Sequence, residues 1–356
     1  MTATKNLSAE IVETCVLCGS RDLEKLFYCE DRLYRLPGVF AIVRCLGCNL
    51  HRLSPRPALK DLPYYYPEDG YYSYQEPGVS ALTVKNRGRL GELRDAIRLS
   101  ALRSLGYPIS PISRWQSSVG RLAAGIFRNR ALYGLSYRFP PYFPEGRALD
   151  IGCGNGAYLS YLKPHGWQVC GVDVSSRAAE VAKSVFDIDV FVGELNDVPF
   201  SSQSFDFVHM SHVIEHMTEP IETLKRIAEL LKPGRLVYIE TPNAESDGFK
   251  AMGKYWFPLE TPRHVYLFSP DTLREALDRA GLRTTRIWTT FFPGAFSWDD
   301  TYKREEIYGS FLPNRPRLRK TQIPRALTKL LASRVRHVFN AFNGDILHVW
   351  AMKPTE

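Results

Sequence analysis

The segment Arg147–Gly156, with the sequence RALDIGCGNG, constrains the fold of this chain more than any other. An aliphatic run ends at three glycines spaced two apart, Gly152, Gly154 and Gly156, and a helical pattern follows. Glycine lets the backbone turn sharply from a strand into a helix and approach a ligand without a Cβ clash. The helix N-terminus adds unpaired N–H donors and a partial positive charge. The segment therefore predicts a nucleotide-type cofactor site on an α/β sheet.

A second predicted strand, Val169–Val174, carries a carboxylate near its end at Asp173. An acid at this place can accept hydrogen bonds from two ribose hydroxyls. The glycine pattern also fits the dinucleotide-binding fingerprint, because Ala157 can replace its third glycine. Asp150 favours a cationic cofactor instead, since a carboxylate just before the glycines would repel a pyrophosphate. S-adenosylmethionine carries a sulfonium and an ammonium group, and Asp150 is the predicted partner of this charge, directly or through water.

These residues resemble motifs I and II of the class I S-adenosylmethionine-dependent methyltransferases. The resemblance covers roughly residues 145–290 and the last strand, and it implies a Rossmann-like α/β sheet with helical insertions. In the third motif of the family, an acid and an apolar neighbour hold the adenine. The cofactor-binding residues implied by the resemblance are Asp150, Gly152, Gly154, Gly156, Asp173, Val174, Glu194, Leu195 and Ser211.

Later segments fit the remaining elements of this fold. A helix is predicted from Pro220, in its first turn, to Lys232, before Gly234, and another from the cap Ser269 to Gly281. The predicted strands of this half are Arg235–Glu240, Arg283–Thr289 and Asp345–Ala351.

Length and composition suit a large core with an appendage. The chain has 356 residues, 44% of them hydrophobic and 24% charged, as in ordinary soluble proteins. It has no apolar run of about 20 residues and no hydrophobic signal region at its start, so we expect a cytoplasmic protein. The expected regions are a zinc ribbon (1–58), a Tyr-rich strap with a basic helical part (59–140), the methyltransferase core (141–290), a basic helical insertion (291–344) and the last core strand (345–356).

Two C-x-x-C pairs predict a structural zinc site near the N-terminus. Cys15 and Cys18 form the first pair, and Cys45 and Cys48 form the second. Each pair places two thiolates on one tight turn, and two such turns can close a tetrahedron around zinc. The chain has seven cysteines, and this odd number argues against a disulfide framework. Because four sulfurs leave no open position on the metal, we expect this zinc to stabilise structure. Redox-active or free thiols are the alternative.

A tyrosine-dense segment follows the cysteine pairs, with Tyr72 and Tyr74 among its residues. A cysteine-pair ribbon, a Pro-rich strap, clustered tyrosines and a methyltransferase core resemble, in this order, the zinc-ribbon methyltransferases of bacterial glycan and deoxysugar biosynthesis. The resemblance implies a sugar acceptor, nucleotide-linked or lipid-linked. Tyrosine offers a sugar both a flat apolar face and a hydroxyl group. Tyr72 and Tyr74 are the candidates for contact with the acceptor, and packing against the core is the alternative.

His216 is the first candidate for acid–base chemistry. The string His212–His216 reads H-x-x-E-H, which matches a metalloprotease motif but lacks the rest of such an architecture. In the resembled family this loop follows a parallel strand and places a histidine in the acceptor pocket. His216 is therefore a predicted general base. A capping or packing role in the loop is the alternative.

His264 is the second candidate base, and a packed or hydrogen-bonded loop histidine is the alternative. The sugar C-methyltransferases carry a Glu-His pair before a similar helix start; here His264 matches the histidine, and Arg263 stands in place of the glutamate. This departure favours O-methylation over C-methylation, because a carbon acid is harder to deprotonate than a hydroxyl. Arg263 is expected to lower the pKa of His264, or to bind a phosphate or carboxylate of the acceptor.

The net charge of +8 suggests an anionic partner. Basic amphipathic patterns at 119–135 and 323–342 predict helices that lie on an anionic membrane or cover the active site. Two other functions stay open. An RNA methyltransferase could dock through the ribbon, although no nucleic-acid motif is evident, and a non-catalytic binding protein could retain the fold.

Overall fold

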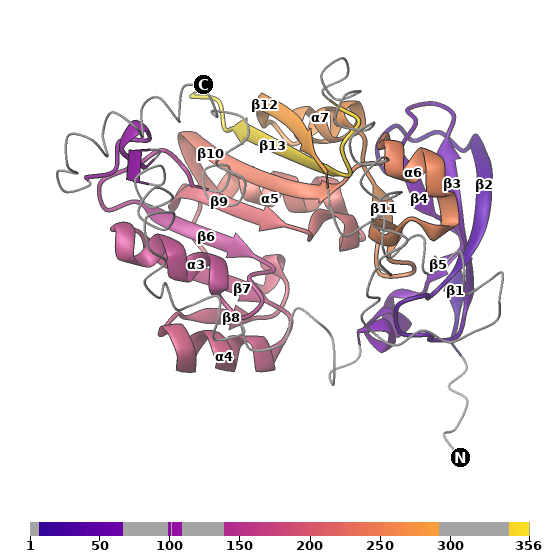
Figure 1. Cartoon of the computed structure of the whole chain (residues 1–356), viewed down its shortest axis with the longest axis horizontal. Coiled ribbons are helices and arrows are strands. Elements are labelled where there is room, and N and C mark those ends of the chain that lie inside the picture. Colours follow the sequence, from indigo (N-terminus) through magenta and orange to yellow (C-terminus); the bar gives the residue numbers. More distant parts are fainter. Residues whose placement is uncertain (1–6, 67–98, 101, 109–138, 292–341, 356) are drawn as a thin grey trace, which may run out of the picture. The chain divides into compact units, whose positions relative to one another are not determined.

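The computed structural model describes residues 7–66, 99–100, 102–108, 139–291 and 342–355 (Figure 1). The chain forms two compact units. One contains Met1–Tyr71, Met210–Glu229 and Ile239–Glu356, and is called the ribbon unit below. The other contains Tyr72–His209 and Leu230–Tyr238, and is called the cofactor unit. Tyr72, Tyr74 and both predicted basic helices lie outside the described residues.

In the cofactor unit, three parallel strands alternate with two helices, as the glycine pattern predicts. The loop turns into the first helix at Gly156, whose φ is +76°, a conformation that glycine adopts without strain. The second helix is capped by Ser175, whose hydroxyl accepts a hydrogen bond from the Ala178 amide at 3.1 Å. The elements are β6 (Arg147–Ile151), α3 (Ala157–Leu162), β7 (Gln168–Asp173), α4 (Ser176–Phe186) and β8 (Val190–Val192).

The helices of this unit pack closely on the strands. Leu159, Ala182 and Ile188 form a buried cluster with Cys153 of the glycine loop. A Cβ atom at Gly156 would lie 2.9 Å from the Cβ of Ala182. The third glycine therefore permits both the turn and the close approach of the two helices.

The main sheet has seven strands in the order β12-β13-β10-β9-β6-β7-β8. β12 and β13 pair in antiparallel fashion at one edge, and β6, β7 and β8 are parallel. This is the Rossmann-like sheet of the class I methyltransferases, so the predicted fold class is confirmed. The further elements are β9 (Phe205–Ser211), α5 (Pro220–Leu230), β10 (Leu231–Pro242), β12 (Arg283–Thr290) and β13 (Ile346–Met352).

One predicted boundary differs from the structure. The helix that begins at Pro220 ends at Leu230 rather than Lys232, and the following strand begins at Leu231 rather than Arg235. Pro233 explains the difference, because the residue before a proline is sterically disfavoured in the helical conformation. The other predicted helix is α7 (Pro270–Arg279), capped by Ser269 as expected.

The N-terminal strands of the ribbon unit share a sheet with a strand from far along the chain. β2 (Leu23–Glu30) and β3 (Val39–Cys45) form an antiparallel hairpin, and β4 (His51–Leu53) pairs with β3. β11 (Tyr266–Leu267) then pairs with β4 and completes the order β11-β4-β3-β2 (Figure 1). The sheet of the predicted ribbon therefore extends beyond residue 58 to the segment that follows His264.

Smaller elements complete the ribbon unit. β1 (Ala9–Glu10) pairs with β5 (Arg56–Pro57), and α6 (Asp247–Met252) is capped by Ser246. One buried cluster combines hairpin residues with residues of α6 and the loop after it, including Phe40, Leu53, Phe249, Trp256 and Leu259. In the described part of the chain, no helix has the length and apolar character needed to cross a membrane.

Candidate functional site

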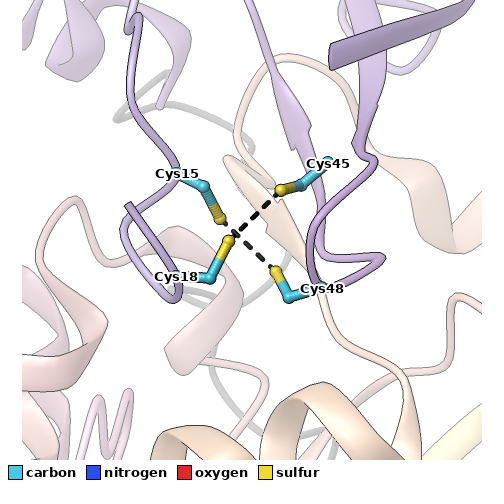
Figure 2. Close-up of side chains that lie close together, drawn as sticks. All are labelled: Cys15, Cys18, Cys45 and Cys48. Carbon is cyan, nitrogen blue, oxygen red and sulfur yellow. Dashed lines mark hydrogen bonds between the residues drawn. The ribbon is translucent and has the colours of Figure 1, made fainter. Parts of the chain in front are cut away.

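The four cysteines of the two pairs converge on one point (Figure 2). The Sγ atoms of Cys15 and Cys48 lie 3.5 Å apart, those of Cys18 and Cys45 lie 3.4 Å apart, and all four Sγ atoms lie within 4.8 Å of one another. Four thiolates at about 2.3 Å from a tetrahedral zinc ion would be about 3.8 Å apart. The donor set and its spacing therefore fit zinc.

Tight backbone turns hold both cysteine pairs. The Gly19 amide donates to the Cys15 carbonyl at 2.8 Å, with Gly19 at φ +74°. The Asn49 amide donates to the Cys45 carbonyl at 2.8 Å in the equivalent turn of the second pair. Each turn brings the two thiols of its pair to the same side, which is the geometry that the C-x-x-C spacing predicts.

In the cofactor unit, Asp173 organises the glycine loop. Its Oδ2 accepts from the Gly154 amide at 2.7 Å, and its Oδ1 accepts from the Ser175 amide at 2.9 Å. Burial raises the pKa of Asp173, and these two hydrogen bonds oppose that rise. Each carboxylate oxygen has a second lone pair. Asp173 can thus hold the loop and still accept hydrogen bonds from a ribose.

Apolar side chains are exposed beside this carboxylate. Val174, directly after β7, is 65% exposed, and Phe191 and Val192 of β8 are 43% and 55% exposed. The Gly193 amide donates to the Asp173 carbonyl at 2.9 Å, which holds the end of β8 against the end of β7. Exposed apolar groups of this kind can pack on an adenine ring. Sequence reasoning identified Val174 but not Phe191 or Val192, although their place at the end of β8 was the available signal.

Three other residues predicted to bind the cofactor, Glu194, Leu195 and Ser211, lie in or beside regular elements of the structure. Glu194 directly precedes a short 3-10 helix, and its amide donates to Asp197 Oδ2 at 3.4 Å. Leu195 is buried in that helix. Ser211 is the last residue of β9 and is partly buried.

Asp150 has a partner that sequence reasoning missed. Its Oδ1 lies 2.6 Å from Nδ1 of His209, and both side chains are buried. The ring of His209 stacks with the rings of Tyr158, at 3.7 Å, and Tyr238, at 5.5 Å. One oxygen of Asp150 is therefore committed to the protein. The only signal in the sequence was a histidine inside the hydrophobic strand Phe205–Ser211.

In the ribbon unit, His216 and His264 lie next to each other. Their ring centroids are 4.6 Å apart and the rings are nearly perpendicular, at 80°. The Nδ1 of His264 donates to the Pro258 carbonyl at 2.8 Å, and the Nδ1 of His216 donates to the Arg263 carbonyl at 3.0 Å. A carbonyl oxygen can only accept, so Nδ1 carries the proton in both rings. The lone pair of each neutral ring is therefore on Nε2.

Carboxylates surround this histidine pair. The Nε2 of His264 lies 3.9 Å from Glu215 Oε1 and 3.8 Å from Glu260 Oε2. Glu215 also accepts from the Thr241 hydroxyl at 2.8 Å and from His212 Nδ1 at 3.2 Å. The H-x-x-E-H string thus folds so that its first histidine contacts its glutamate, and this glutamate faces His264.

The pKa values differ among these groups. Burial lowers the pKa of His264 to about 4 and that of His216 to about 4. A positive charge on His264 would lower the pKa of His216 further, and the charges of His212 and Arg263 lower the pKa of His264. Burial also opposes the charged form of His212, but hydrogen bonds to Glu215 and Glu240 outweigh it and raise the His212 pKa. The His212 side chain is 40% exposed, so water screens these ion pairs in part. Near neutral pH, His216 and His264 are neutral bases.

Arg263 does not serve as an anion-binding residue, which corrects one of the two roles expected for it. Its side chain is fully buried and binds Asp31 through two hydrogen bonds, at 2.9 and 3.0 Å. Its Nε also donates to Glu260 Oε1 at 3.1 Å. Because the guanidinium group is buried with these partners, it presents no exposed N–H groups to a phosphate. The positive charge of Arg263 does contribute to the low pKa of His264, as expected.

A tyrosine contacts the histidine pair, but it is neither of the two predicted ones. The hydroxyl of Tyr66 lies 2.9 Å from Nδ1 of His216. Because Nδ1 carries the proton, the Tyr66 oxygen accepts this hydrogen bond. Tyr66 belongs to the same tyrosine-dense segment as Tyr72 and Tyr74, which lie outside the described residues, so their predicted contact with the acceptor stays a prediction.

Comparison with known proteins agrees with the fold and the glycine loop. A family described as "Methyltransferase domain" matches residues 125–287. Together with the identity to curated relatives given below, this match shows that the chain belongs to the class I S-adenosylmethionine-dependent methyltransferases. S-adenosylmethionine is accordingly the methyl donor.

The curated relatives include enzymes named ubiquinone biosynthesis O-methyltransferase. The one from Brucella anthropi is 32% identical over 171 residues, which cover 45% of this chain and 69% of that protein. The one from Chelativorans sp. is 32% identical over 184 residues, covering 48% of this chain and 72% of that protein. A solved S-adenosylmethionine-dependent methyltransferase from Archaeoglobus fulgidus is 20% identical with a TM-score of 0.40, covering 65% of this chain and 94% of that one.

Proposed function

We propose that this methyltransferase transfers the methyl group to a hydroxyl oxygen of a small-molecule acceptor. The observation that carries the proposal is the pair of neutral imidazoles, the partly buried His216 and the buried His264, whose Nε2 lone pairs are fixed by hydrogen bonds from Nδ1 to backbone carbonyls. A neutral imidazole is the base best suited to remove a hydroxyl proton near pH 7. Bound S-adenosylmethionine supplies the electrophilic methyl group.

In this mechanism the protein positions the acceptor hydroxyl and the methyl group of the cofactor, and it removes one proton from the hydroxyl. The acceptor O–H proton passes to Nε2 of His264 or His216. The oxygen forms the new bond to the methyl carbon as the carbon–sulfur bond breaks and the neutral thioether leaves. Glu215 and Glu260 stabilise the resulting imidazolium, since both carboxylates face Nε2 of His264. Displacement at a sulfonium neutralises charge, so accurate positioning contributes most of the rate.

We propose a sugar as the acceptor, in a nucleotide-linked or lipid-linked glycan precursor. The polar character of the cluster supports this, because Tyr66, the two imidazoles and the carboxylates offer many hydrogen-bonding groups. The Tyr-rich segment with Tyr72 and Tyr74 remains the candidate for packing against the sugar. The names of the curated relatives favour a second candidate, the hydroxyl of a ubiquinone precursor.

We further propose that zinc, bound by Cys15, Cys18, Cys45 and Cys48, stabilises the segment that presents His264. Support comes from β11, which follows His264 and pairs with β4, only a few residues from Cys48. The Leu53 amide also donates to the Val265 carbonyl at 2.9 Å. These contacts give the ribbon a function inside the enzyme, which makes an RNA-docking role unnecessary.

The test is methyl transfer from radiolabelled S-adenosylmethionine to two matched acceptor sets. One set contains nucleotide sugars with free hydroxyls, and the other contains phenolic ubiquinone precursors. We expect the unmodified enzyme to label the sugar and the His264→Ala variant to leave it unlabelled. Mass spectrometry should identify the product as a methyl ether. Labelled phenol alone would replace the sugar proposal with the second candidate. A methyl group on carbon or nitrogen, or no transfer to either set, would overturn the O-methylation proposal.

A further inference from the structure

Asp150 and His209 form a buried pair on neighbouring strands of the cofactor unit. The Nδ1 of His209 lies 2.6 Å from Asp150 Oδ1, and the side chains are only 3% and 4% exposed. β6 and β9 are adjacent in the sheet, although β7 and β8 separate them in the sequence. Open α/β sheets bind their ligands where the strand order reverses in this way. The pair therefore lies at the part of the fold where a cofactor is expected.

The hydrogen bond fixes the proton of the histidine. Nδ1 of His209 donates to the carboxylate oxygen Oδ1 of Asp150, which leaves Nε2 as the other polar atom of the ring. This Nε2 is buried and has no hydrogen-bond partner among the described residues. Leaving a polar atom unpaired in a hydrophobic strand is unfavourable, and Phe207 and Val208 beside it are fully buried. Packing alone would be served better by an apolar residue.

Two aromatic rings hold the imidazole in this orientation. Tyr158, in the first turn of α3, stacks on it with an angle of 17° between the rings, and Tyr238 stacks with an angle of 12°. Turning the imidazole away from Asp150 would disturb both stacking contacts. The orientation of the Asp150 carboxylate is therefore determined by its neighbours before any ligand binds.

This arrangement leaves one oxygen of Asp150 for a ligand. Oδ1 is committed to His209, and no hydrogen bond to Oδ2 is found in the described part of the chain. We propose that His209 is a positioning residue for cofactor binding. It holds Asp150 by Oδ1 so that Oδ2 faces a cationic group of S-adenosylmethionine.

The test is calorimetric binding of S-adenosylmethionine to the full chain and three variants. His209→Asn keeps an N–H donor near the position of Nδ1, whereas His209→Phe keeps the ring and removes the donor. Val208→Ala is the matched control, because its side chain is buried on the opposite face of the same strand. We expect affinity to fall about tenfold or more in His209→Phe and about threefold or less in the other two. Equal losses in all three, or no loss in His209→Phe, would overturn the proposal.

A second measurement uses the native protein and does not depend on how the variants fold. Histidine labelled with ¹⁵N distinguishes the two ring nitrogens by NMR. We expect His209 to be protonated at Nδ1 before cofactor is added, and its resonances to shift on titration with S-adenosylmethionine. Protonation at Nε2, or no shift at saturation, would contradict the proposal. Because no acceptor is present, these results do not depend on which acceptor the enzyme methylates.

Discussion

Arg263 and Asp31, which are 232 residues apart in the sequence, form a bidentate ion pair in which both side chains are completely buried. Asp31 directly follows the first strand of the N-terminal hairpin, and Arg263 directly precedes His264. Arg263 also donates to the Tyr65 carbonyl at 3.1 Å. The pair thus joins the cysteine-bearing part of the chain to the loop that carries the proposed base.

Asp31→Ala is expected to destabilise the protein by about 3–5 kcal/mol, because it leaves the Arg263 guanidinium buried without its main counter-charge. Urea unfolding followed by circular dichroism measures this change in free energy. The matched control is Glu24→Ala, which breaks the exposed pair with Arg44 on the same hairpin and should cost about 1 kcal/mol or less. Similar losses of unfolding free energy in both variants would show that the buried pair does not hold the loop.

His264→Gln is expected to lower kcat by about 10²- to 10⁴-fold, the usual contribution of a positioned general base. Affinity for S-adenosylmethionine should not change, and calorimetry tests this. His165→Gln is the control, since His165 is a partly buried histidine of the cofactor unit whose Nδ1 bonds to the Tyr161 carbonyl. If kcat of His264→Gln stays within about threefold of the unmodified enzyme, the same test applies to His216→Gln.

The enzyme should keep its full rate of methyl transfer at unusually acidic pH. The pKa values of His216 and His264 are lowered to about 4, so both stay neutral below the ordinary histidine value of about 6.5. We expect kcat/KM to be flat from neutral pH to about pH 5 and to fall toward pH 4. A midpoint near 6.5 would indicate that neither His216 nor His264 is the base.

The free energy of unfolding should depend on pH through the same two histidines. Between pH 6.5 and 4 the unfolded chain binds protons at these two histidines and the folded chain does not, so stability is complete above about 6.5 and is lost as pH falls toward 4. Thermal unfolding at a series of pH values measures this loss. Substitution of both residues by glutamine should remove this part of the pH dependence.

Removing zinc should unfold the N-terminal sheet. Structural zinc contributes directly to folding free energy, so a strong chelator or Cys45→Ser is expected to lower Tm markedly. Elemental analysis should find one zinc per chain in the native protein and none in the variant. Cys170→Ala, a cysteine outside the cluster, should keep its zinc. Full zinc content in Cys45→Ser would contradict the four-cysteine site.

Asp173→Ala is expected to weaken cofactor binding by about a hundredfold or more, since it removes an acceptor for the ligand and the hydrogen bond that holds Gly154. Calorimetric titration gives the dissociation constant. Asp189→Ala removes an 80% exposed carboxylate of the same unit and should leave binding unchanged. Equal affinities would remove Asp173 from the cofactor site.

Local sequence patterns predicted the parts of this protein that depend on neighbouring residues. The glycine spacing determines the turn at Gly156, and the two C-x-x-C pairs determine the cysteine turns. Contacts between distant segments were not predictable in this way. Nothing local to Arg263 indicates that Asp31 neutralises it, and the Asp150–His209 pair requires the strand order, because β9 comes to lie beside β6 only in the folded sheet.

The pairing of β11 with β4 has a consequence for how the chain acquires its structure during synthesis. The N-terminal hairpin leaves the ribosome first, but its sheet lacks an edge strand until Tyr266 and Leu267 have been translated. Pairings over such long sequence separations form late and leave hydrophobic surface exposed meanwhile. A fragment that ends near residue 60 would therefore also lack the guanidinium that neutralises Asp31. The N-terminal segment is consequently not a transplantable module, and fusions or truncations should retain the whole chain.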